Sequence, residues 1–69
     1  MNVIEKAAKK YVETEVQRLG LRVWQVTSPH NASIENVKGD LIHQGVEFKS
    51  TEVFVNNAYS IEIELLRTI

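Results

Sequence analysis

The last clearly patterned run of the chain, residues 59–65, alternates strictly between apolar and polar side chains. Its apolar members are Tyr59, Ile61, Ile63 and Leu65, and the residues between them are Ser60, Glu62 and Glu64. This two-residue period predicts a β-strand with one buried and one solvated face. Such a strand needs neighbouring strands and a covering layer. We therefore expect an antiparallel sheet, with Glu62 and Glu64 facing water and discouraging unwanted edge pairing.

Residues 2–19 predict a long amphipathic helix that packs on this sheet. The apolar side chains fall within about half of a helical wheel, and they are Ile4, Ala7, Ala8, Tyr11, Val12, Val16 and Leu19. Asn2 is placed to cap the start, and Gly20 suits the left-handed position just past the end. Glu15 falls inside the apolar stripe, where we expect its carboxylate to reach solvent or to pair with Arg18.

Residues 21–27 (LRVWQVT) predict a second strand, because they are rich in β-formers and carry apolar side chains on both faces. A two-sided strand usually lies centrally in its sheet. Residues 28–31 predict a turn, since Pro29 presets φ and the flanking Ser28 and Asn31 bond to nearby backbone. Trp24 has two interpretations, a packed core side chain or an interface residue, because tryptophan is enriched in binding hot spots.

Two structures compete for residues 33–45. In the first, Ser33 caps a second short helix that ends at Gly45, with apolar residues at helical spacing, Ile34, Val37 and Leu41. In the second, residues 40–43 form a short strand that returns antiparallel over residues 46–50 after a two-residue turn. The sequence leaves both alternatives open.

The chain is β-like from Val46 onward, but its apolar residues change parity. One face receives Val46 and Phe48, and the other receives Val53 and Val55. A single regular strand would send half of these side chains outward, so we expect a β-bulge or a break near Ser50-Thr51. Asn56-Asn57-Ala58 predicts a turn, because asparagine tolerates left-handed backbone.

A chain of 69 residues has room for one small core, so we expect a single domain over residues 1–69. Together the elements predict an α+β fold, with an N-terminal helix packed on a small antiparallel sheet of three or four strands. The second short helix before Gly45 is one alternative. No signal-peptide pattern and no apolar stretch of membrane-spanning length is present, so we expect a cytoplasmic protein that does not enter the membrane.

The net charge of −1 provides no general attraction for nucleic acid. A nucleic-acid-binding module would need a local basic patch, for which the candidates are Lys6, Lys9 and Lys10. Acidic residues interleave with these lysines, and a solvated helix face is the simpler interpretation. His30 and His43 match no paired metal-ligand spacing, and cysteine is absent, so we expect no resident metal or other cofactor.

One pattern carries catalytic chemistry, Gly39-Asp40 followed by Glu47-Phe48-Lys49. It resembles the D…E-x-K motif of restriction-endonuclease-like nucleases, and the resemblance covers residues 5–50. It implies a site in which Asp40 and Glu47 hold Mg²⁺ and Lys49 supports the attacking water, with Glu15 as the helix acid that some members add. In the hairpin alternative, side-chain alternation puts Asp40, Glu47 and Lys49 on one face of the hairpin. The chain departs from the family in its short spacing between the acids and in having glycine where the family has proline.

From size and the scarcity of catalytic motifs, we expect a small non-enzymatic interaction protein. It would bind a protein partner by surface complementarity and self-associate as a homo-oligomer, because apolar burial alone has to support a small core without disulfides. The candidate binding residues are Trp24, Lys6, Lys9 and Lys10. Inhibitors and accessory factors of mobile genetic elements such as phages are often of this kind. A metal-dependent nuclease and a nucleic-acid-binding module remain as alternatives.

Overall fold

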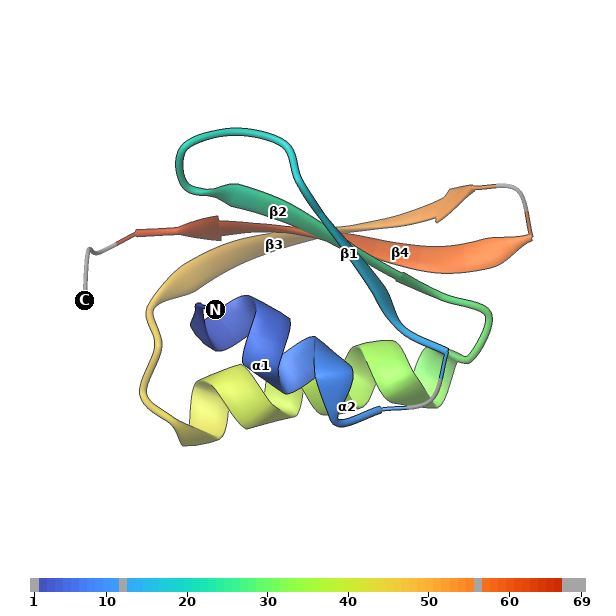
Figure 1. Cartoon of the computed structure of the whole chain (residues 1–69), viewed down its shortest axis with the longest axis horizontal. Coiled ribbons are helices and arrows are strands. Elements are labelled where there is room, and N and C mark those ends of the chain that lie inside the picture. The colour runs from blue at the N-terminus through green and yellow to red at the C-terminus, as the bar shows by residue number, and fades with distance from the viewer. Residues whose placement is uncertain (1, 12, 56, 67–69) are drawn as a thin grey trace.

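The computed structural model describes residues 2–11, 13–55 and 57–66. Its elements follow in the order α1 (Val3–Lys9), β1 (Glu15–Arg18), β2 (Val23–Ser28), α2 (Asn31–His43), β3 (Phe48–Val55) and β4 (Ala58–Leu65). The four strands form one antiparallel sheet in the order β1-β2-β4-β3, and both helices lie on one face of it (Figure 1). The predicted α+β fold with an N-terminal helix on an antiparallel sheet is confirmed.

The chain is built from two units of the same kind, each a helix followed by a β-hairpin. The first unit comprises α1, β1 and β2, and the second comprises α2, β3 and β4. The second strands of the two hairpins, β2 and β4, pair antiparallel in the middle of the sheet, with Val26 opposite Ile61. The sheet order therefore reads the same from either edge, which gives the fold an approximate two-fold symmetry.

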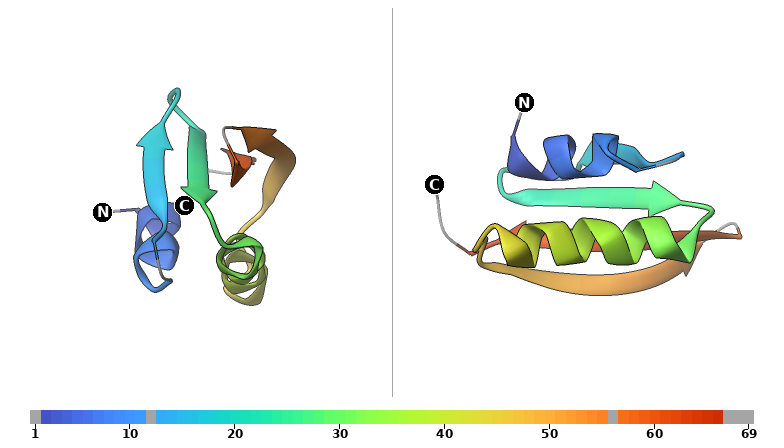
Figure 2. Two further views of the ribbon diagram at one scale, coloured as in Figure 1. Left: turned by 90° about the vertical axis from the view of Figure 1, so that its right-hand side faces the viewer. Right: turned by 90° about the horizontal axis from the view of Figure 1, so that it is seen from below.

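The core lies between the sheet and the two helices. From the central strands it receives Trp24, Val26, Ile61 and Ile63, and from the helices it receives Ile4, Ala7, Ala8, Ile34, Val37 and Leu41. The helices lie side by side beneath the sheet, with α2 nearer β3 (Figure 2). Full burial of a large aliphatic side chain contributes about 1.5–3 kcal/mol, so these few residues supply most of the driving force for folding.

The opposite face of the sheet is mostly polar. Because cross-strand partners share a face, it carries Glu15, Gln17, Gln25, Thr27, Lys49, Thr51, Ser60, Glu62 and Glu64, together with Val23 and Val53. At its centre the hydroxyl groups of Thr27 and Ser60 are 2.9 Å apart and hydrogen-bonded across the β2–β4 pair. Antiparallel sheets tolerate one solvated face, and the predicted alternation holds at Ile61 and Ile63, which are buried in the core. At the start of β4 it does not hold, because Tyr59 is 40% exposed and Ser60 is buried.

The predicted helix over residues 2–19 is wrong beyond Lys9. Its start is confirmed, because Asn2 Oδ1 accepts a hydrogen bond from the backbone N–H of Glu5 and the Glu5 carboxylate accepts one from Asn2. At Glu13 the backbone enters the left-handed region with φ 53°, and Glu15 begins β1. Val16 fits the apolar pattern of a helix and also that of a strand, because in β1 it lies opposite Val26 and packs against the core. Val12, also assigned to the helix, is outside the described residues.

For residues 33–45 the helix alternative is confirmed and the hairpin alternative is wrong. The helix α2 begins at Asn31, so Ser33 lies inside its first turn and does not cap it. At its end, Gly45 has φ 77° and donates to the carbonyl of Ile42, while Val46 donates to the carbonyl of Leu41. These two bonds form a Schellman motif, which satisfies carbonyls that the helix leaves without partners.

The predicted bulge near Ser50-Thr51 is also wrong, because β3 pairs with β4 without interruption from Phe48 to Val55. A bulge would be needed only if one face of β3 were buried along its whole length. Instead β3 lies at the sheet edge, outside α2 (Figure 2), and its helix-side residues Ser50 and Glu52 remain exposed. In the predicted turn that follows, Asn57 has φ 60°, as expected, and Asn56 is outside the described residues.

The strand predicted at residues 21–27 is confirmed as β2, and it is central in the sheet. Among the residues that the structure describes, neither helix has the length and apolar character needed to cross a membrane.

Replacing each of the two glycines of the α2 region with alanine should change the free energy of unfolding in opposite directions. Gly39 lies in the helix interior, where an added Cβ meets nothing within 4 Å, so Gly39→Ala should raise the free energy of unfolding by about 0.5–1 kcal/mol. Gly45→Ala should lower it by about 1 kcal/mol, because φ 77° is costly for a residue with a Cβ. Urea unfolding followed by circular dichroism measures both, and equal effects of the two substitutions would contradict the assigned helix end.

Candidate functional site

The residues of the D…E-x-K resemblance do not come together. Asp40 lies on α2, where its carboxylate accepts a hydrogen bond of 2.9 Å from Lys10 Nζ. Lys49 lies on β3 opposite Glu64, on the sheet face away from the helices, and Glu15 is on that same polar face at the far edge of the sheet. Glu47 is exposed in the connection before β3. The arrangement that would let these residues share an Mg²⁺ ion is therefore not formed.

Within the described residues, no group of three or more histidine, aspartate or glutamate side chains is placed to hold a metal ion. The expected pairing of Glu15 with Arg18 is not formed either, because Arg18 lies opposite Trp24 on the helix side of β1 and Glu15 lies on the other side. The alternation of a strand separates two residues that a helix would have brought together.

The three candidate lysines are all exposed, Lys6 and Lys9 on α1 and Lys10 at its C-cap. Lys10 also joins α1 to α2 through Asp40. The hydrogen bond that Lys10 donates to Asp40, and then the negative charge of Asp40, raise the pKa of Lys10 above the ordinary value of 10.5. Asp40 is mostly screened from solvent, with 17% of its side chain exposed, so this ion pair serves the packing of the helices.

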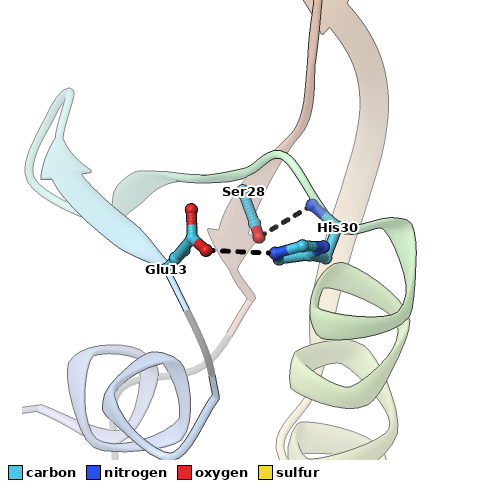
Figure 3. A network of polar contacts seen from close by, with 3 residues as sticks. All are labelled: Glu13, Ser28 and His30. Atoms are coloured by element: carbon cyan, nitrogen blue, oxygen red, sulfur yellow. Dashed lines mark hydrogen bonds and ion pairs between the residues drawn. The ribbon is translucent and has the colours of Figure 1, made fainter.

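A polar network at the start of α2 has the residue types of a hydrolytic triad (Figure 3). His30 Nε2 is 3.3 Å from Glu13 Oε1, and the backbone N–H of His30 donates to Ser28 Oγ at 3.1 Å. The imidazole thus contacts the acid but not the hydroxyl, and Ser28 is fully buried. A catalytic serine needs its hydroxyl bonded to the base and exposed to substrate. This network instead holds the turn between β2 and α2.

Trp24, the candidate interface residue, is 6% exposed and belongs to the core. The guanidinium of Arg18 lies over its ring, 5.4 Å from the centroid. Arg18 also donates from Nε to the carbonyl of Gly20 at 2.9 Å and from Nη2 to the carbonyl of Leu21 at 2.8 Å. One side chain therefore fixes the β1–β2 loop and covers the tryptophan.

Beside Trp24 the surface is hollowed into a groove of about 890 Å³, which we call the end groove. Four segments line it: the start of α1, the β1–β2 loop, the end of α2 and the end of β4. The lining residues are Asn2, Val3, Glu5, Arg18, Leu21, Arg22, Trp24, Gln44, Val46 and Leu65. Leu21 stands at its rim with 81% of its surface exposed. The end groove combines an aromatic ring, aliphatic side chains and two arginines.

Of the end-groove residues, only Trp24 was among the predicted binding residues. Leu21 and Arg22 were assigned to the second strand, and Arg18 to a helix. The available signal was the run Leu19-Gly20-Leu21-Arg22, in which apolar residues flank a glycine between two β-like stretches. An apolar residue in a hairpin loop has no core to enter, so it is a candidate contact residue.

Searches of protein-family models, of curated proteins and of solved structures each found no match to this chain.

The Lys10–Asp40 pair should contribute stability with a defined pH dependence. A raised lysine pKa means that the contribution is complete below pH 10.5 and disappears as the pH rises through the raised value. We expect Lys10→Met and Asp40→Asn to show a coupling free energy in a double-mutant cycle at neutral pH, and none above the raised pKa.

Urea unfolding at the two pH values measures this coupling. Lys6→Met is the matched control, since Lys6 is an exposed lysine on the same helix. A coupling that persists at high pH, or one of equal size between Lys6 and Asp40, would show that the ion pair is not its source.

Proposed function

We propose that this chain is a small non-enzymatic interaction protein, an inhibitor or accessory factor that binds another protein inside the cell and also self-associates. The observation that carries the proposal is the end groove, in which Leu21 stands 81% exposed beside a floor formed by Trp24, Val46 and Leu65. Tryptophan and arginine are the residue types most enriched in binding hot spots, and both line this groove.

The position of the end groove supports binding of a partner segment. It lies where the β1–β2 loop and the ends of both helices meet, so its walls come from elements that the core already holds in place. A groove with rigid walls loses little conformational entropy when it is occupied, which favours affinity. Leu21 is held there because Arg18 fixes the backbone carbonyls on both sides of the loop tip.

The charges of the end groove indicate the chemistry of its partner. The carboxylate of Glu5 is engaged in the capping box of α1, and Arg18 is engaged with the loop carbonyls. Arg22 is exposed and makes no ion pair among the described residues. The complementary partner is a protein segment with an apolar side chain for the floor and a carboxylate beside it for Arg22.

Self-association is the second part of the proposal, and it is supported by the exposed apolar side chains outside the end groove. Ile42 and Phe54 are 65% and 63% exposed. Single exposed apolar residues are normal on a monomer, but in a chain of 69 residues they are also available for contact between copies.

The end groove can be tested with displayed random peptides. We expect selected peptides to carry an apolar residue next to aspartate or glutamate, and to perturb the fluorescence of Trp24, the single tryptophan. Leu21→Gln should weaken their binding several-fold, because it removes the most exposed apolar side chain at the rim of the groove. Ile42→Gln is the matched control, because Ile42 is comparably exposed but does not line the groove.

Titration by fluorescence and by nuclear magnetic resonance shifts measures both the affinity and the position of binding. Failure to enrich any peptide sequence, or peptides that bind Leu21→Gln as tightly as the unchanged chain, would contradict the proposed groove.

A further inference from the structure

The strand β3 presents a long unpaired edge. It is eight residues long, pairs only with β4, and is the outermost element on its side of the molecule (Figure 2). The backbone groups on its outer side have no strand to pair with among the described residues. The other edge strand, β1, is only four residues long. Unpaired backbone of this length is a template for another strand.

Two of the usual protections of an edge strand, proline and a bulge, are missing from β3. Proteins also prevent unwanted pairing with charged side chains, and β3 carries two of these, Lys49 and Glu52. The sequence of β3, FKSTEVFV, has no proline, and its register with β4 is unbroken over all eight residues. The edge is therefore regular enough to accept a partner strand along its whole length.

Of the two charges on β3, Glu52 is paired within the same molecule, because its Oε1 is 3.1 Å from Lys38 Nζ of α2. Lys49 lies opposite Glu64 in the strand register, on the sheet face away from the helices, and makes no ion pair among the described residues. Glu52 therefore does not present an unpaired charge to a strand that approaches the edge.

In β3, phenylalanine lies three residues from Thr51 on each side, as Phe48 and Phe54. From this edge and this pattern we infer that two copies of the chain pair antiparallel through β3, about a two-fold axis beside Thr51. The inference rests on the self-association part of the proposed function and names its interface. The product is a continuous eight-stranded sheet with all four helices on one face.

The register centred on Thr51 is selected by side-chain matching, because residues directly opposite in an antiparallel pair share a face and touch. It places the exposed Phe54 of each copy against the half-buried Phe48 of the other, and Ser50 against Glu52. Moving the axis to Ser50 would place Phe48 against Glu52. Moving it to Glu52 would place two glutamates directly opposite each other.

The β3 edge and the end groove are separate surfaces, since no residue of β3 lines the groove. In the dimer both grooves remain accessible. The protein would then present two equivalent binding sites to a partner.

Single cysteines test the register, because the natural sequence contains none. Thr51→Cys should form an intermolecular disulfide with oxidised glutathione as oxidant, since opposed residues lie about 4.5–5.5 Å apart between their Cα atoms. Lys49→Cys and Val53→Cys should each stay monomeric under denaturing conditions, because equivalent residues are then about 13 Å apart along the strand. An equal mixture of those two variants should cross-link, since residue 49 faces residue 53 of the other copy.

Light scattering of the unchanged chain should give twice the 7.9 kDa chain mass. Thr51→Lys should give the single-chain mass, because two lysines would meet at the axis. Within one molecule that lysine lies opposite Glu62, which favours the fold, and circular dichroism confirms that folding is retained. Gln17→Lys, on the same face of the other edge strand, should leave the dimer intact.

A dimer whose cross-linking is no faster at residue 51 than at residue 49 would overturn the β3 interface and leave self-association standing. A single-chain mass at all concentrations would overturn both. Peptide binding at the end groove is unaffected by either result, so a failure of groove binding is recognised separately.

Discussion

Among the described residues, the large buried apolar side chains gather on one face of one sheet. With 69 residues the chain can place only two helices over four strands, so a single layer of side chains between them forms the core. That layer is centred on the pairing of β2 with β4, where Val26 and Ile61 lie opposite each other and are fully buried. The opposite face stays polar, and the hydroxyl pair of Thr27 and Ser60 joins the two units there.

This one-sided construction determines where binding surfaces can occur. The helices cover the middle of the sheet, but they leave its outer strand β3 and the β1–β2 loop outside the covered area. The loop still needs a fixed conformation, and Arg18 supplies it with two hydrogen bonds to loop carbonyls. Exposed apolar side chains at these places, Leu21 and Phe54, result from a helix layer that is smaller than the sheet. The end groove and the β3 edge both follow from that difference in size.

Local signals in the sequence predicted the strand at residues 59–65, whose alternation admits one period only. For residues 33–45 they left two alternatives open, because Gly45 suits both a helix end and a hairpin turn, and φ 77° at Gly45 belongs to the helix end. The long N-terminal helix failed because Val16 fits the core-facing position of a helix and of a strand equally well, while Leu19 lies beyond β1 and is exposed. The left-handed backbone at Glu13 that separates α1 from β1 has no marker such as glycine. The end groove could not be predicted, because four segments distant in sequence assemble it and only Trp24 stood out by residue type.

The arrangement of two helix–hairpin units has a consequence for the order in which the protein folds. Each hairpin joins strands that are adjacent in the chain, whereas the seam between β2 and β4 joins strands separated by α2 and β3. Closing that long loop costs chain entropy before the core contacts compensate for it. We therefore expect the hairpins to form early and their docking along the seam to limit the folding rate. A contact that is already formed at the rate-limiting step changes the folding rate when it is lost. Substitutions at the hairpin tips should therefore slow folding, and contacts completed only after docking should affect mainly the unfolding rate.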